Sequence, residues 1–307
     1  MKKRIIAFLL AMLLVAASFA GCAGGTGGNN DAQAGYPLTI TDDLGNEVTF
    51  ETVPEKILSS SPSITEIVYA LGLEEKLVGV TAYCDYPLEA KEKPQLIDFA
   101  GPNVERIIEA APDVLFSDVA YGIPEDTQAL LDNAGIKIVI MTYDSIDDVL
   151  DNISLIGQVM DVAEPAQQLR DDLTQQMEEI CSFKVDRAST VFVDVGGFYT
   201  TGSGTYLDDM IQKAGAVNVA ASLGNGWVQI PVETLLEKNP DVYIDLAVEK
   251  DGDLPAEPLV QPLAAIQEGR VYTYSYSSNE TAILSRPGPR FVEALRLLVE
   301  LIYPEAM

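Results

Sequence analysis

The most informative absence in this chain of 307 residues is histidine, of which there is none. Without an imidazole the chain cannot build a Ser-His-Asp triad, a Cys-His pair, an HExxH zinc site or a histidine ligand to haem iron. Carboxylate pairs, Ser-Lys pairs and tyrosines remain available for catalysis. The composition therefore favours a binding protein over an ordinary hydrolase, and we expect no enzyme activity, no resident cofactor and no metal site.

Positive charge is also scarce. The chain has 19 basic and 47 acidic side chains, and its formal net charge is −28. Such a charge repels nucleic acid and anionic lipid headgroups, so we expect no nucleic-acid partner. The length suggests about two domains of roughly 150 residues each, and 48% hydrophobic residues is ample for buried cores.

The first 35 residues have the pattern of a targeting segment. Lys2, Lys3 and Arg4 precede an apolar run over residues 5–20, which is short for a membrane span but suits a signal peptide over 1–21. The run ends Ser-Phe-Ala-Gly before Cys22, which resembles the lipobox of bacterial lipoproteins. Residues 22–35 then read as a lipidated cysteine and a Gly-rich tether. The alternative is a retained anchor helix with an incidental cysteine. The sequence thus predicts an extracytoplasmic protein, held on the cell membrane by a lipid on Cys22.

Cysteine is rare as well, with three residues in all. If Cys22 carries lipid, Cys84 and Cys181 remain. They fall in different predicted lobes, so a disulfide between them is not indicated, and we expect two free thiols.

After residue 36, strand and helix patterns alternate, which is typical of parallel α/β sheets. The pattern predicts an N-terminal α/β lobe over 36–160, a connecting helix within 161–183 and a C-terminal α/β lobe over 184–307. Strands are expected at 56–60, 77–81, 114–117, 137–142 and 190–194, and helices at 63–71, 104–110, 125–134, 145–160 and 164–181. In such open sheets ligands bind beyond the strand ends, so we expect a ligand cleft between the lobes.

The two predicted lobes contain an internal repeat. Residues 104–114 match residues 232–242 at six of eleven positions, covering a helix, its end at Pro-Asp and the start of the next strand. A weaker match relates residues 64–72 to 207–215, and chance similarity between helices could explain that one.

Glu105 and Glu233 lie at matched positions in the first turn of the repeated helix. One interpretation is local, because an acidic side chain near a helix N-terminus stabilises the helix by roughly 0.3–1 kcal/mol. The other is functional, because a two-fold symmetric partner could offer the same basic pocket to each lobe. The sequence around these two residues favours neither interpretation over the other.

Aromatic side chains gather in the segments that follow predicted strands. Rigid aromatics in loops suit large planar or cyclic ligands, although some of these side chains will pack in the core. Two arginines just before the last helix, Arg286 and Arg290, either face the cleft or pair with the chain's own carboxylates. The candidate ligand-binding residues are Tyr83, Tyr86, Phe99, Tyr199, Trp227 and Arg286.

Taken together, these segments resemble the substrate-binding lipoproteins of ABC importers with a helical inter-lobe connector, the group that handles vitamin B12, haem and ferric siderophores. The resemblance extends over nearly all of the chain from residue 38. It is strongest at residues 58–67, 70–72, 78–81, 83–87 and 103–107, where the sequence is similar to the B12-binding members.

The resemblance implies roles for particular residues. Glu105 and Glu233 match two glutamates that dock on arginines of an ABC permease dimer, one per lobe. Tyr83 matches a tyrosine that touches the corrin ring, and Phe99 and Trp227 fall at or beside aromatic ligand contacts. Asp118 departs from the pattern, since it replaces an aromatic residue of the cleft.

The resemblance therefore implies a membrane-tethered protein that delivers cobalamin or a related corrinoid to an ABC permease. The alternatives are a ferric siderophore or haem carried by the same class of transporter and, from another class, an enzyme on the same scaffold.

Overall fold

The computed structural model describes residues 35–250 and 258–305. The described residues from 36 onward belong to one compact unit. The predicted signal peptide, the lipidation of Cys22 and the tether up to residue 34 lie outside the described residues. In the described part of the chain, no helix is long and apolar enough to cross a membrane.

The first lobe is built on a six-stranded sheet with the order β6-β5-β4-β3-β7-β8. All neighbouring strands are parallel except β5 and β6. The central strands are buried on both faces, as expected for a parallel sheet covered by helices. The strands are β3 (Ile57–Ser59), β4 (Leu77–Thr81), β5 (Gln95–Asp98), β6 (Gly101–Pro102), β7 (Val114–Asp118) and β8 (Lys137–Met141).

The second lobe is built on a four-stranded parallel sheet with the order β11-β9-β13-β14. Its strands are β9 (Thr190–Asp194), β11 (Val217–Asn218), β13 (Val242–Val248) and β14 (Val271–Ser275). Two further two-stranded antiparallel sheets are described, the hairpin of β1 (Leu38–Thr41) with β2 (Glu47–Phe50), and the pair of β10 (Tyr199–Thr201) with β12 (Trp227–Gln229). The prediction of an α/β fold with two similar, mostly parallel lobes is confirmed.

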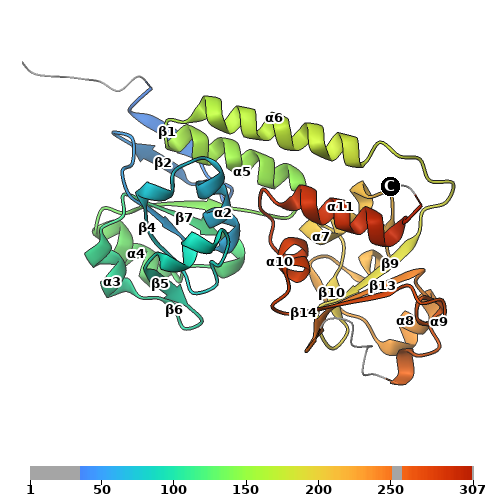
Figure 1. Cartoon of the computed structure of the whole chain (residues 1–307). Helices are drawn as coiled ribbons and strands as arrows, with labels where there is room; N and C mark the ends of the chain where they lie inside the picture. The colour runs from blue at the N-terminus through green and yellow to red at the C-terminus, as the bar shows by residue number, and fades with distance from the viewer. Residues whose placement is uncertain (1–34, 251–257, 306–307) are drawn as a thin grey trace, which may run out of the picture. The chain divides into compact units, whose positions relative to one another are not determined.

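The chain passes from β8 to β9 through α5 (Ile146–Val159) and α6 (Ala163–Ile180), which lie side by side in Figure 1. The predicted domain boundaries stay predictions, but the expected helix over 164–181 differs from α6 by one residue at each end. The other helices are α2 (Pro62–Ala70), α3 (Val104–Ala110), α4 (Glu125–Asn133), α7 (Tyr206–Lys213), α8 (Val232–Lys238), α9 (Ala264–Gln267), α10 (Asn279–Ser285) and α11 (Phe291–Ile302).

One large apolar core connects the two sheets with α5, α6 and α11. It contains Ile57 and Phe116 from the first sheet, Val191 and Ile244 from the second, and Leu295 from α11, all fully buried. A core shared in this way makes large independent movement of the lobes costly, because buried apolar area would be exposed at about 25 cal/mol per Å².

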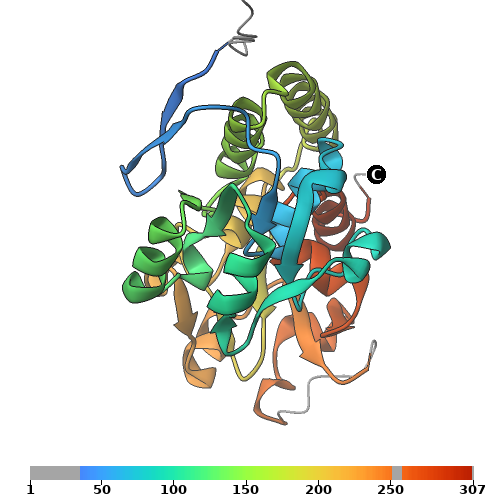
Figure 2. The same ribbon diagram turned by 90° about the vertical axis from the view of Figure 1, so that its left-hand side faces the viewer.

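Hairpin β1–β2, drawn in blue at the left of Figure 2, is hydrogen-bonded to the first lobe at its turn and near its start. Both carboxylates of the turn accept backbone N–H groups of the β8 segment, Asp42 from Ile140 at 3.3 Å and Asp43 from Thr142 at 2.6 Å. The Tyr36 hydroxyl donates to the carbonyl of Val159 at 2.7 Å. The acidic turn therefore has a structural role, since its carboxylates bond to β8.

The internal repeat has a detailed structural counterpart. Helices α3 and α8 each have seven residues, and each ends at a left-handed residue, Ala111 or Asn239. The aspartate that follows caps the neighbouring strand in both lobes. Asp113 accepts the N–H of Lys56 at 2.9 Å, and Asp241 accepts the N–H of Thr190 at 2.7 Å. The match between residues 104–114 and 232–242 thus reflects equivalent structure.

The weaker match also corresponds to equivalent helices. The Ser61 hydroxyl caps α2 by accepting the N–H of Ile64, and the Thr205 hydroxyl caps α7 by accepting the N–H of Asp208. Both helices are followed by a glycine with positive φ, Gly72 and Gly215. Equivalent structure therefore explains the weaker match, and chance similarity is not needed.

Candidate functional site

A cavity of about 350 Å³ lies between the two lobes, at the carboxyl ends of strands from both sheets. Its lining includes Asp118 at the end of β7, Tyr143 after β8, Val195 after β9 and Leu246 near the end of β13. Ligands of open α/β sheets bind at this edge, because neighbouring loops diverge there. We call this cavity the cleft.

Helix ends provide the rest of the cleft wall. The first turn of α2 contributes Pro62 and Ser63, and the start of α7 contributes Thr205 and Tyr206. The end of α10 and the segment after it contribute Leu284, Ser285, Arg286 and Pro287, and Trp227 comes from β12. The cleft is thus lined by both halves of the repeat and by the C-terminal segment.

The floor of the cleft carries polar groups without partners. The hydroxyls of Tyr143, Thr201 and Tyr206 are buried, and among the described atoms none of the three has a hydrogen-bond partner. Burial raises the pKa of Tyr143 and of Tyr206 above their ordinary value, so both side chains are neutral phenols at physiological pH.

Asp118 is the acidic group of the floor. Its backbone N–H donates to Ser60, and one carboxylate oxygen accepts the N–H of Ala120 at 2.9 Å. Burial, together with the nearby carboxylate of Asp144, outweighs the hydrogen bonds from Ala120 and Ser61 and raises the pKa of Asp118 to about 6. Asp118 is therefore mostly ionised at pH 7 and mostly protonated at pH 5.

Two of the predicted ligand-binding residues, Trp227 and Arg286, line the cleft together. Trp227 is 64% exposed. Arg286 forms an ion pair with Asp85, so its charge is already compensated within the chain. Both interpretations given for Arg286 thus hold at once, because it faces the cleft and is paired.

Tyr86 lies beside the cleft. It lines a neighbouring cavity of about 210 Å³ with Arg286 and Tyr276, and its ring covers the guanidinium of Arg290, 3.8 Å from the ring centroid. Arg290 itself does not face the cleft. It is buried and bonds to Glu66, which confirms the alternative of pairing with the chain's own carboxylates.

The remaining predicted aromatic residues lie outside the lining of the cleft. Tyr83 and Phe99 contact each other edge to face, with 6.1 Å between ring centroids. Phe99 is 95% exposed, and Tyr199 is about half exposed on β10. Their predicted roles as ligand contacts stay predictions.

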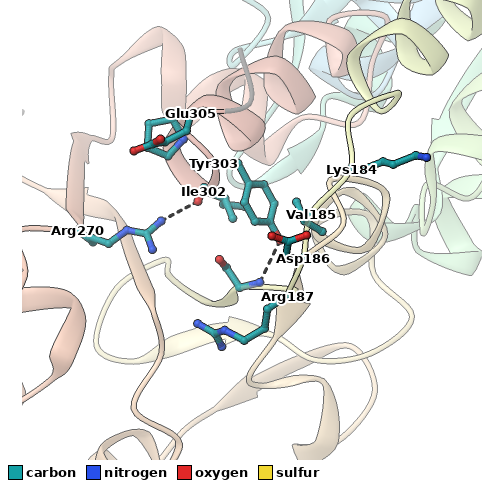
Figure 3. A pocket seen from close by; sticks show the side chains of 10 residues that line it. Lys184, Val185, Asp186, Arg187, Arg270, Ile302, Tyr303 and Glu305 are labelled. Atoms are coloured by element: carbon teal, nitrogen blue, oxygen red, sulfur yellow. Dashed lines mark hydrogen bonds between the residues drawn. The ribbon is translucent and has the colours of Figure 1, made fainter.

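A more open cavity of about 520 Å³ lies at the end of α11 (Figure 3). Its lining includes three basic residues, Lys184, Arg187 and Arg270, and both arginines have partners within the chain. Arg187 pairs with Asp241, and Arg270 donates to the carbonyl of Ile302 at 2.7 Å. None of the predicted site residues lines this cavity. Within the described ranges, no cluster of three or more Cys, Asp or Glu side chains is arranged to hold a metal ion.

Comparison with known proteins identifies the family to which this chain belongs. The family model described as "Periplasmic binding protein" matches residues 57–276. The chain belongs to this family.

Relatives of this periplasmic binding protein cover most of the chain. It is 33% identical to the Bacillus subtilis protein named "Uncharacterized ABC transporter substrate-binding lipoprotein YvrC", over 99% of both chains. It is 29% identical to the "Vitamin B12-binding protein" of Pectobacterium atrosepticum, over 62% of this chain and 71% of the relative. A crystal structure of a periplasmic haem-binding protein from Pseudomonas aeruginosa has 25% identity and a TM-score of 0.72, over 83% of this chain and 94% of that one.

In this periplasmic binding protein, Glu105 and Glu233 are both exposed in the first turn of equivalent helices, α3 and α8. Neither forms an ion pair within the part of the chain that the structure describes. An acidic side chain stabilises its helix through the macrodipole and needs no side-chain partner to do so. Both carboxylates are therefore available to a partner protein.

None of the three residues with floor hydroxyls is among the ligand-binding residues predicted from the sequence. Tyr143 follows the end of a parallel strand, which is the position where a ligand contact is expected, and this signal could have found it. Thr201 lies within, and Tyr206 just after, a segment over residues 200–204 that reads as a glycine-rich loop. In the structure Thr201 ends β10, and Tyr206 begins α7 with its side chain buried. Cys84 and Cys181 are both free thiols, as predicted.

Proposed function

We propose that this protein is the substrate-binding component of an ABC importer, held outside the cytoplasm by a lipid on Cys22. In this proposal it captures a cobalamin-like corrinoid in the cleft and delivers it to a permease dimer. The similarity to YvrC over 99% of both chains supports the transport class. The protein would act by binding alone, without catalysis or a resident cofactor.

The observation that carries the proposal is the composition of the cleft. Apolar side chains such as Val195, Leu246 and Leu284 surround a few buried polar groups, and Trp227 lies at the wall. This combination is typical of small-molecule sites, where apolar area gives affinity and polar groups fix orientation. The volume of about 350 Å³ is near the lower end for such sites, so a ligand as large as a corrinoid would insert one edge and extend outward.

Similarity to a vitamin B12-binding protein supports the corrinoid. The exposed rings of Tyr83, Phe99 and Tyr199 would then contact the part of the macrocycle that projects from the cleft. A flat ring system buries a large area on such side chains at little cost in conformational entropy.

Haem, or a ferric siderophore, is the second candidate ligand. Similarity to a haem-binding structure favours haem, and tyrosine is an established ligand of haem iron. However, haem carries two propionates, and the one cation among the described lining residues, Arg286, is already paired with Asp85. The charges of the cleft therefore favour the corrinoid.

Fluorescence of Trp227, the single tryptophan, gives a direct test. We expect cyanocobalamin to quench it with saturation at micromolar concentration or below, whereas haem and ferric siderophores quench only at much higher concentration. A Trp227→Phe variant, followed by calorimetry, separates true binding from optical absorption by the ligand. Absence of saturable binding of cobalamin, with tight binding of haem or a siderophore, would overturn the choice of ligand but leave the transport class intact.

Glu105 and Glu233 would be the docking residues for the permease. They are exposed, equivalent by the repeat and free to meet the same basic pocket on each half of a two-fold symmetric partner. Charge complementarity of this kind fixes register and speeds encounter without touching the ligand site.

A further inference from the structure

The buried hydroxyls without a hydrogen-bond partner belong to residues that line one cavity, the cleft. Four buried side-chain atoms of the described residues lack a hydrogen-bond partner, and three of them are the hydroxyls of Tyr143, Thr201 and Tyr206. These side chains are only 7%, 3% and 6% exposed, and all three line the cleft. Buried hydroxyls are normally satisfied, so three in one cavity indicate that a ligand supplies the partners.

The charges of the cleft lining are mainly negative. Asp118 and Asp144 contribute two carboxylates, and Arg286 is the one cation among the described lining residues. Arg286 is already paired with Asp85, so it offers little compensation to an incoming anion. A ligand carboxylate entering the floor would meet a buried carboxylate, Asp118, without a free cation beside it.

We propose that Asp118 and the hydroxyls of Tyr143, Thr201 and Tyr206 form a subsite for a neutral carboxamide group of the ligand, and that this subsite discriminates against a carboxylate at the same place. A carboxamide has two N–H donors and one carbonyl acceptor, whereas a carboxylate has acceptors only. Asp118 accepts from the amide nitrogen, and the hydroxyls donate to its carbonyl or accept its second N–H.

This inference rests on the proposed function and deepens it, because it names the chemical feature by which the cleft selects its ligand. Cobalamin carries neutral carboxamide side chains around its macrocycle, whereas haem carries two propionates. Binding specificity of this kind arises from polar groups that one ligand satisfies and the other leaves unpaired.

The test compares cyanocobalamin with its monocarboxylate derivatives, in which one peripheral carboxamide is hydrolysed to the acid. By calorimetry at pH 7.5, we expect at least one derivative to bind about 10-fold or more weakly than cyanocobalamin. Asp118→Asn removes the buried charge, so the difference should shrink to less than about 3-fold. Asp186→Asn, an exposed change in the cavity of Figure 3, should leave the discrimination unchanged. Equal affinity of wild-type protein for all forms would overturn the subsite.

A second pair of ligands separates the subsite from the choice of corrinoid. If cyanocobalamin does not bind, the proposed ligand fails, and haem is compared with its bis-amide, in which both propionates are converted to carboxamides. Tighter binding of the bis-amide would still support the subsite. Equal binding, tighter binding of haem, or no binding of the bis-amide would overturn it. Circular dichroism of the Asp118→Asn variant checks that it is folded.

Discussion

Arg290 donates to both carboxylate oxygens of Glu66, from Nε at 2.9 Å and from Nη2 at 2.7 Å. The two residues are 224 positions apart and join the first lobe at α2 to the start of α11. Their side chains are only 8% and 3% exposed, and Tyr86 covers the guanidinium from one side. This buried ion pair fixes the C-terminal segment against the first lobe directly beside the cleft.

Removing one partner of this pair should be costly. We predict that Arg290→Met lowers the free energy of unfolding by about 3–5 kcal/mol, because it leaves the Glu66 carboxylate buried without a counter-charge. The double variant Glu66→Met with Arg290→Met should recover much of the loss, since no charge is then left unpaired. Denaturant unfolding measures both.

An exposed pair provides the control. Lys76 lies 3.1 Å from Glu55, whose side chain is 77% exposed. We expect Lys76→Met to cost less than about 1 kcal/mol. Equal losses for Arg290→Met and Lys76→Met would show that the buried pair has no special role.

Permease docking is tested by reversing charge at the matched glutamates. Glu105→Lys together with Glu233→Lys should reduce uptake by at least about 10-fold, since like charges then face each other across the interface. Ligand affinity should not change, because neither residue lines the cleft.

The repeat supplies a matched control for docking. Glu109 and Glu237 are also exposed and lie one turn further along the same two helices. Glu109→Lys with Glu237→Lys makes the same change in charge, and we expect uptake close to wild type. If both double variants reduce uptake equally, the effect is one of net charge and the specific docking roles are wrong.

Stability should fall as the pH rises from about 4 to 7. Burial raises the pKa of Asp118 and of Asp245 to about 6. A carboxyl whose pKa is raised in the folded state favours folding while it is protonated, so its contribution is complete below its unfolded pKa near 4 and is lost as the pH passes 6. Each group contributes about 3 kcal/mol, since one unit of pKa corresponds to about 1.4 kcal/mol.

Asp241 changes stability with pH in the opposite direction, but it does so outside the range from pH 4 to 7. Hydrogen bonds from Arg187 and Thr190 outweigh the effect of burial and lower its pKa to about 2, so its contribution is lost only below pH 4. Denaturant midpoints measured across pH 4–8 test the prediction. Asp118→Asn with Asp245→Asn should make the slope clearly smaller, although Asp144, Asp194 and Asp209, whose pKa burial also raises, keep part of it. An unchanged slope in that variant would contradict the assignment to Asp118 and Asp245.

The absence of histidine makes a spectroscopic prediction. The protein cannot supply an imidazole to the cobalt of a bound corrinoid. We therefore expect bound cobalamin to keep its own lower base or a solvent ligand, with a visible spectrum close to that of the free form. A spectrum that changes to a new nitrogen-ligated form on binding would mean that another group of the protein coordinates the metal.

The fold could be predicted where local signals agree. The expected helix over 104–110 and strand over 190–194 match α3 and β9 residue for residue, because capping residues, glycine stops and apolar runs mark the same boundaries. The antiparallel pair β10–β12 was missed, since its three-residue strands lie among glycines, show no clear alternation and are far apart in the sequence.

The site was predictable only in part. Trp227 was found among the aromatic residues of segments that follow predicted strands, and Arg286 from its place just before the last helix. The position of Tyr143 after a strand could have indicated it, but the lack of partners for the floor hydroxyls is a property of the packed structure. The burial of Arg290 against Glu66 was left open for the same reason, since 224 residues separate the pair.

The most direct test of the account is a crystal structure of the protein with cyanocobalamin bound. We predict the macrocycle between the lobes, with a carboxamide nitrogen or oxygen within about 3.2 Å of the Tyr143 or Tyr206 hydroxyl. Cobalamin bound elsewhere, such as in the cavity of Figure 3, or no bound cobalamin at saturating concentration, would contradict it.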